Sequence, residues 1–179
     1  MAEPRGRGGR KLMVAYSFQR QFVDPILSGR KQQTIRAPRI GRSRHARPGE
    51  QLQLYVGMRT RHCRLVGRAK AFRVRAIEVA LHALDPALDF VDLAATTGAM
   101  AVQHRADWLD LFAVSDGFAS WAEMRAFWLR HNVPPEFGKP DGPFPNGAVW
   151  DGVLIEWRRF EPGATFSTAA APMMEGADG

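Results

Sequence analysis

The alternation of apolar and polar residues predicts several strands, then helices, then a final strand. A period of two is clearest in QLQLYV and in the longer segment from Arg61 to Val79. One face of that long segment is apolar and the other carries a row of arginines, and Gly67 indicates a bulge. Gly152 indicates a bulge or kink in the last strand. The predicted strands are residues 12–18, 33–36, 51–56, 61–79 and 148–157.

Two helices are predicted before the last strand. Ser120 and Glu123 have the spacing of a capping box, which opens a helix at residues 121–131. The apolar stripe of that helix, which we expect in the core, consists of Trp121, Met124 and Trp128. An earlier helix over residues 106–113 places on one side Trp108, Leu111 and Phe112.

Shorter features complete the pattern. Asp24 is expected to cap a helical turn with Pro25 at its first position, and Gly29 to end that turn in a left-handed conformation. Residues 37–49 predict a basic loop, and residues 80–104 a helix or loop. Strands in a run followed by helices predict an α+β fold, in which a small closed or nearly closed β-structure carries attached helices.

These elements form one predicted domain, residues 12–161 of the 179. A chain of this length buries enough apolar surface to fold without a metal or disulfide as a staple. Residues 1–11 are rich in glycine and arginine and predict a disordered basic arm. Residues 162–179 lack periodicity and predict a disordered tail.

Basic charge is concentrated near the N-terminus. Residues 30–75 contain fourteen Lys and Arg against one acid, Glu50, a net charge of +13. Residues 76–179 contain six basic and fifteen acidic residues, a net charge of −9. Such a field favours a polyanion at one face, which points to RNA or a nucleotide. The alternative is that many arginines only pair with the acidic half of the chain.

Other classes of function find no support in the sequence. Cys63 is the single cysteine, so the chain cannot form an internal disulfide, which is usual for a cytoplasmic protein. No run of about 18 apolar residues predicts a membrane-spanning helix, and no secretory signal is recognisable. The five histidines are not spaced as zinc ligands, and no phosphate-binding loop occurs. We expect a cytoplasmic protein without metal, cofactor or membrane partner.

The segment GRKQQTIRAPR, residues 29–39, carries the candidate chemistry. A threonine hydroxyl such as that of Thr34 becomes a nucleophile when a base removes its proton, and Lys31 can do so if its pKa is depressed. The charges of Arg30 and Arg36 are the expected cause of that depression. The candidates for an assisting acid are Asp116, Glu123 and Asp151. Spacing alone favours a simpler interpretation, a charged turn in which Thr34 only forms a hydrogen bond.

An ordered set of motifs resembles the ASCH domains, small proteins of the PUA superfamily. The resemblance spans residues 13–157, and its most specific part is the G-x-K-x-x-T-I-R run. The motifs are FQRQF at 18–22, ILSGRK at 26–31, TIR at 34–36, PGEQLQL at 48–54, VGRA at 66–69, DGF at 116–118, FW at 127–128 and VLIEW at 153–157.

The resemblance implies a PUA-like small β-barrel with flanking helices and a cleft beneath the G-x-K-x-x-T-I-R segment. RNA binding is the function usually inferred for the family; some members remove the acetyl group from N4-acetylcytidine, using a lysine, a threonine and a glutamate. By resemblance, the catalytic residues map onto Lys31, Thr34 and Asp116, with aspartate in place of glutamate.

We therefore expect a basic cleft that binds RNA or a modified nucleoside and hydrolyses an N4-acylated cytidine amide. Phe18 either stacks a base there or fills the end of the β-structure. The expected binding residues are Arg30, Arg36, Arg39, Arg44, Arg68, Lys70 and Phe18. The alternatives are a non-catalytic RNA-binding module and a ribonuclease.

Overall fold

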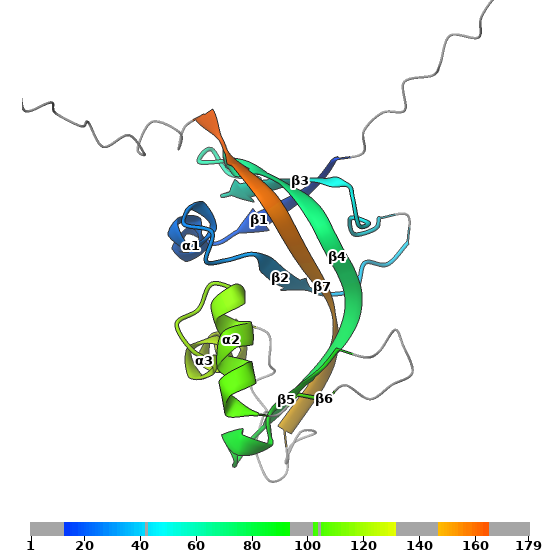
Figure 1. Ribbon diagram of the computed structural model, residues 1–179, viewed down its shortest axis with the longest axis vertical. Helices are drawn as coiled ribbons and strands as arrows, with labels where there is room; N and C mark the ends of the chain where they lie inside the picture. Colours follow the sequence, from blue (N-terminus) through cyan, green and yellow to red (C-terminus); the bar gives the residue numbers. More distant parts are fainter. Residues whose placement is uncertain (1–12, 42, 94–101, 104, 132–146, 165–179) are drawn as a thin grey trace, which may run out of the picture.

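In the part of the chain that the structure describes, one seven-stranded mixed sheet forms the frame, with three α-helices on its concave side (Figure 1). This computed structural model describes residues 13–41, 43–93, 102–103, 105–131 and 147–164. The strands are β1 Met13–Phe18, β2 Gln33–Arg36, β3 Gln51–Val56, β4 Arg64–His82, β5 Phe90–Asp92, β6 Val102–Gln103 and β7 Gly147–Pro162. The helices are α1 Val23–Leu27, α2 Ala106–Ser115 and α3 Trp121–His131, with short 3₁₀ turns η1 Arg20–Phe22 and η2 Pro86–Leu88.

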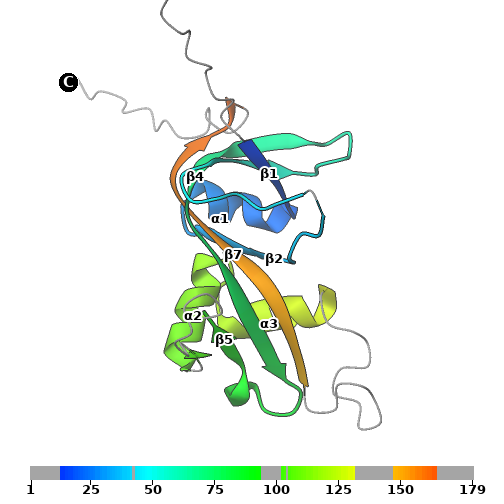
Figure 2. The same ribbon diagram turned by 90° about the vertical axis from the view of Figure 1, so that its right-hand side faces the viewer.

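The two long strands β4 and β7 run antiparallel along the height of the molecule (Figures 1 and 2). At one end β4 also pairs with β3, which pairs in parallel with β1, and β7 pairs with β2. At the other end β4 pairs with β5, and β5 with β6. The ladder of β4 with β3 shifts register beside Gly67, as the sequence predicted. The layout places β2 between the strand-rich end and the α2–α3 pair.

The expected closed barrel is not confirmed. Among the described residues no backbone ladder joins β1 to β2, so the sheet stays open along a seam between these two strands. The Nη2 of Arg36 on β2 donates instead to the carbonyl of Ser17 on β1, at 2.7 Å. This side-chain hydrogen bond links the two strand edges where a closed barrel would have a backbone ladder. The seam between β1 and β2 therefore remains lined by side chains.

Several local predictions are confirmed and others are wrong. Helix α3 begins as predicted, with the Glu123 amide donating to the Ser120 hydroxyl at 3.3 Å, and its apolar stripe is buried. Gly29 is left-handed, with φ +76°. On α2, however, Leu111 is 68% exposed, because only the side of the helix that contains Phe112 faces the core. Asp24 is not the cap: α1 begins one residue before it.

Gly152 is not a bulge. The ladder of β7 with β4 passes through it without a shift, whereas a Cβ there would lie 2.9 Å from Cγ2 of Ile35. The glycine therefore allows β2 to pack closely against β7. In residues 80–104, where the sequence predicted a helix or loop, the described part contains the end of β4, η2, β5 and β6. Strand β7 extends to Pro162, while the predicted arm and most of the predicted tail lie outside the described residues.

Candidate functional site

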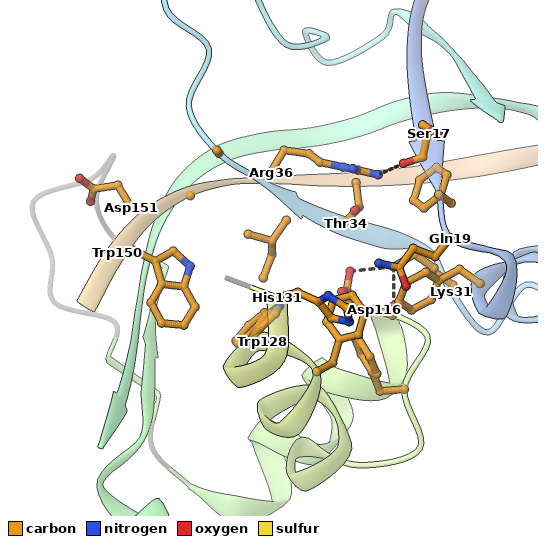
Figure 3. Close-up of a pocket in the computed structure, with 17 residues that line it drawn as sticks. Ser17, Gln19, Lys31, Thr34, Arg36, Asp116, Trp128, His131, Trp150 and Asp151 are labelled. Carbon is orange, nitrogen blue, oxygen red and sulfur yellow. Dashed lines mark hydrogen bonds and ion pairs between the residues drawn. The ribbon is translucent and has the colours of Figure 1, made fainter. Parts of the chain in front are cut away.

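A buried lysine lies where β2, α1 and α2 meet. The Lys31 side chain is 2% exposed, and its Nζ donates to the carboxylate Oδ1 of Asp116 at 3.0 Å and to the backbone carbonyl of the same residue (Figure 3). The ammonium also lies 4.7 Å from the centre of the Phe22 ring and 5.6 Å from that of Phe18. These contacts replace much of the hydration that burial of the amine removes.

Hydrogen bonds hold the start of β2 against the C-terminal end of α2. The Gln32 amide donates to the Ser115 carbonyl at 2.9 Å, and Nε2 of Gln33 donates to the Phe112 carbonyl at 3.0 Å. The last carbonyls of a helix have no partner within the helix and carry partial negative charge, so amides and an ammonium are favourable there. This anchorage brings Lys31 to an acid that lies 85 positions away in the chain.

Gly117 makes room for the lysine. Its φ of +96° lies in the region that favours glycine, and a Cβ at this position would lie 3.0 Å from Cδ of Lys31. Gly29 has a similar φ of +76° but open space around it. The Asp116-Gly117 turn therefore serves two purposes: it reverses the chain after α2, and it leaves the volume that the Lys31 stem occupies.

Replacing Gly117 by alanine is expected to cost more than the same change at Gly29. Both substitutions strain a left-handed backbone, by about 1–3 kcal/mol each. Only at Gly117 does the new methyl also displace the Lys31 stem. Urea unfolding should therefore show a larger loss of stability for Gly117→Ala. Equal losses in the two variants would mean that the lysine stem moves aside freely.

Burial shifts both groups of this pair toward their neutral forms. Loss of hydration lowers the pKa of Lys31 below 10.5, an effect that the Asp116 carboxylate opposes and the nearby Arg36 strengthens. Loss of hydration likewise raises the pKa of Asp116 above 3.8, opposed by Lys31 and Arg36. The sequence predicted a depressed lysine pKa but attributed it to neighbouring arginines. Burial is the main cause, and Arg30 takes no part.

The pair lies in the wall of a pocket of about 560 Å³, which we call the Lys31 pocket. Thr34 and Arg36 come from β2, and Figure 3 shows Thr34 and Asp116 directed toward the same space. Within the part of the chain that the structure describes, no hydrogen bond engages the Thr34 hydroxyl. Aromatic rings and the α3 end complete the lining, through Phe18, Phe22, Phe118, Phe127, Trp128, His131 and Trp150.

The structure thus brings together Lys31, Thr34, Asp116, Arg36 and Phe18, but disperses the other residues expected to bind nucleic acid. Arg30 is exposed in the segment after α1 and donates to the Phe118 carbonyl. Arg39 lies on the far side of the seam, and Arg44 forms an ion pair with Glu50 at 2.6 Å. On β4, near the distal end of β7, a separate surface contains Arg68 and Lys70.

Several pocket residues were not anticipated from the sequence as site residues, among them Gln19, Trp128, His131 and Trp150. Trp128 was predicted as core, and it is indeed 4% exposed, with its ring edge-to-face against Trp150 at 5.5 Å. An amphipathic stripe does not distinguish a ring that ends in the core from one that also borders a pocket. Asp151 also lines the pocket, whereas Glu123 accepts from the Ala119 amide near the start of α3.

Two further observations concern the described residues only. They contain no group of three or more His, Cys, Asp or Glu side chains arranged to hold a metal ion. None of their helices has the length and apolar character needed to cross a membrane. Cys63, the single cysteine, is exposed.

Comparison with known proteins gives limited similarity. No protein-family model matches the sequence, and no curated protein matches it. Among solved structures, two mutants of ZmASCH from Zymomonas mobilis are similar, each with a TM-score of 0.43. The alignments have 12% and 13% identity and cover 85% and 86% of this chain and 71% and 73% of the other.

Proposed function

We propose that this chain is an ASCH-type, PUA-like protein that binds a modified pyrimidine nucleoside in the Lys31 pocket and hydrolyses an N4-acyl amide on its base. The observation that carries the proposal is the buried Lys31–Asp116 pair, which lines one pocket with the unengaged hydroxyl of Thr34. A pocket of about 560 Å³ is of the size that holds one small-molecule ligand. Its aromatic lining suits a planar base.

The proposed reaction uses three side chains. The neutral amine of Lys31 removes the Thr34 proton while the hydroxyl oxygen attacks the acyl carbonyl. The resulting Lys31 ammonium then protonates the departing exocyclic nitrogen as the carbon–nitrogen bond breaks, which leaves an ester on Thr34 and free cytidine. Water hydrolyses this ester and regenerates the hydroxyl. Asp116 orients the lysine throughout, and Arg36 contributes positive charge where the carbonyl oxygen becomes anionic.

Catalysis explains the burial of Lys31 better than binding alone does. An ammonium loses its hydration when it is buried, and a pocket that only contacted phosphate would keep its lysine solvated. A base, in contrast, must lose its proton near neutral pH, and burial lowers the pKa of Lys31 in that direction. The same feature gives a non-catalytic RNA-binding module no benefit, so we favour the hydrolase.

The test is release of cytidine from N4-acetylcytidine by the purified protein, followed by chromatography across a range of pH. Activity should rise with pH through the lowered pKa of Lys31, below 10.5, because the neutral amine is the active form. In Asp116→Asn the carboxylate that raises the Lys31 pKa is gone, so the rise should move to lower pH. Thr34→Val should remove turnover at every pH.

The outcomes separate the proposed function from its alternatives. An unshifted pH profile in Asp116→Asn would assign the titrating group elsewhere. If the wild type releases no cytidine at any pH but degrades RNA, the ribonuclease is the better function. If it does neither and binds RNA with an affinity that falls steeply with salt, the chain is a binding module.

A further inference from the structure

A second hollow lies on the other side of Arg36 from the Lys31 pocket. It measures about 420 Å³ and is lined by residues of β1, the loop after β2 and the loop after β3. Its polar lining consists of three arginines, a tyrosine and a histidine, namely Arg36, Arg39, Arg59, Tyr16 and His45, with a serine at its edge. None of the described residues that line it is an acid. We call it the arginine pocket.

The charges of this pocket remain available for a ligand. Arg36 and Arg39 donate to backbone carbonyls, those of Ser17 and Arg44, and neither forms an ion pair with a described carboxylate. The Nε of Arg36 is buried without a hydrogen-bond partner among the described residues. By contrast, the nearby Arg44 is neutralised by Glu50. Clustered, unneutralised guanidinium groups favour an anion with several oxygen atoms.

The surrounding structure holds these arginines in place. The Tyr16 ring lies 5.8 Å from the guanidinium carbon of Arg36 and 5.4 Å from that of Arg39. The ring itself is fixed, because its hydroxyl accepts from the Ala46 amide at 3.0 Å and contacts Nδ1 of His45 at 3.3 Å. The aromatic ring thus serves as a common platform for two cations.

Arg59 reaches the pocket from a strained turn. Its φ of +68° is costly for a residue with a side chain, and the turn is closed by the Thr60 amide and hydroxyl, which both bond the Gly57 carbonyl. Strain of this kind is retained where it places a functional side chain. Within the described residues Arg59 has no ion-pair partner, so its charge faces the hollow unneutralised.

We propose that the arginine pocket binds the phosphate of the nucleotide whose base occupies the Lys31 pocket. Ser17, Arg36 and Ala37 line both pockets, so the two sites adjoin each other at the seam between β1 and β2. A ligand that places its base in one of two adjoining pockets can place its phosphate in the other. This inference rests on the proposed function and narrows its substrate class. The substrate is a nucleotide, free or within an RNA strand, and the unphosphorylated nucleoside is a poor substitute.

The experiment compares four ligands on the wild-type protein: N4-acetylcytidine, its 5′- and 3′-monophosphates, and a trinucleotide with N4-acetylcytidine at its centre. Each phosphate contact to arginine is a charge-assisted hydrogen bond, so a phosphorylated ligand should show a KM about 10- to 100-fold below that of the nucleoside. If a monophosphate has a lower KM than the nucleoside, the substrate is a free nucleotide. If only the trinucleotide has a lower KM, the pocket binds a phosphodiester of an RNA strand.

Substitutions then test whether the arginine pocket causes the lower KM of the phosphorylated ligands. In Arg39→Gln and Arg59→Gln the ratio of nucleoside KM to nucleotide KM should fall toward one. Arg61→Gln is the matched control, since Arg61 lies in the same turn, is exposed and contacts His62 outside the pocket. The salt dependence of nucleotide binding should weaken in Arg39→Gln and Arg59→Gln and stay unchanged in the control.

The inference and the function on which it rests fail in different ways. If the nucleoside is hydrolysed and phosphate brings no decrease in KM, the arginine pocket is not a phosphate site, and the hydrolase stands. If nothing is hydrolysed, calorimetry still tests the phosphate site, by comparing the affinity of the protein for cytidine with its affinity for cytidine monophosphate. Tighter binding of the monophosphate that Arg59→Gln abolishes supports the phosphate site; equal binding of the two overturns it.

Discussion

Lys31→Met is expected to slow cytidine release from N4-acetylcytidine by about 10²–10⁴-fold, the usual contribution of a positioned general base. Methionine preserves much of the volume of the lysine stem beside Gly117 and removes only the amine. The acyl transfer then lacks a group that takes the Thr34 proton and returns it to the leaving nitrogen. Initial rates at saturating substrate measure the effect, since the lost step is chemical and should reduce kcat more than it changes KM.

Gln32→Met is the matched control for this substitution. Gln32 is the exposed neighbour of Lys31, and among the described residues its side chain bonds only the Gly29 carbonyl. The control should retain the wild-type rate. If Lys31→Met, shown to be folded by its thermal transition, also turned over at the wild-type rate, Lys31 would not be the base.

Asp116→Ala is expected to reduce the free energy of unfolding by about 3–5 kcal/mol near neutral pH, because it leaves a buried ammonium without its partner. Part of this loss should be regained as the pH rises. The pKa of Lys31 is lowered in the folded state, so below 10.5 the unfolded chain binds more protons, and stability increases with pH through that window. Urea unfolding at a series of pH values measures both effects.

A double substitution separates charge from packing. Lys31→Met together with Asp116→Leu replaces the buried pair by apolar groups, a change that is often neutral or stabilising. This variant should recover most of the stability that Asp116→Ala loses, yet release no cytidine. If the double variant were as unstable as Asp116→Ala, the loss would come from a cavity and not from an uncompensated charge.

The local pattern of the sequence predicted most strands and helices, but not how the strands pair with one another. The period of two located β3, and the capping box located α3, because both depend on neighbouring residues. Closure of the β-structure depends on whether distant edges reach hydrogen-bonding distance. The strand pattern does not reveal that β1 and β2 stay unpaired and are linked instead by the hydrogen bond from Arg36 to the Ser17 carbonyl.

The candidate site was predicted in part for the same reason. Lys31 and Thr34 were suggested by chemistry within one short segment. Spacing left three acids open. Asp116 was the least constrained of them, since it precedes Gly117 in a loop, and the family resemblance also mapped the acid onto it. The pairing itself could not be predicted, because it depends on hydrogen bonds between β2 and the end of α2. Net charge located the basic half of the chain. It could not show that Arg68 and Lys70 lie on a surface away from the Lys31 pocket.

Strand β7 determines when this site can exist during synthesis. Thr34 is held in register by Ile155, and the amide of Trp157 donates to the carbonyl of Gln32 at 2.9 Å. The ribosome therefore makes the basic half, the lysine and the acid long before the strand that aligns β2. Pairings between distant segments form slowly, because the chain loses the entropy of loop closure before the new contacts stabilise it. The nascent chain can therefore form the Lys31 pocket only after β7 has been synthesised.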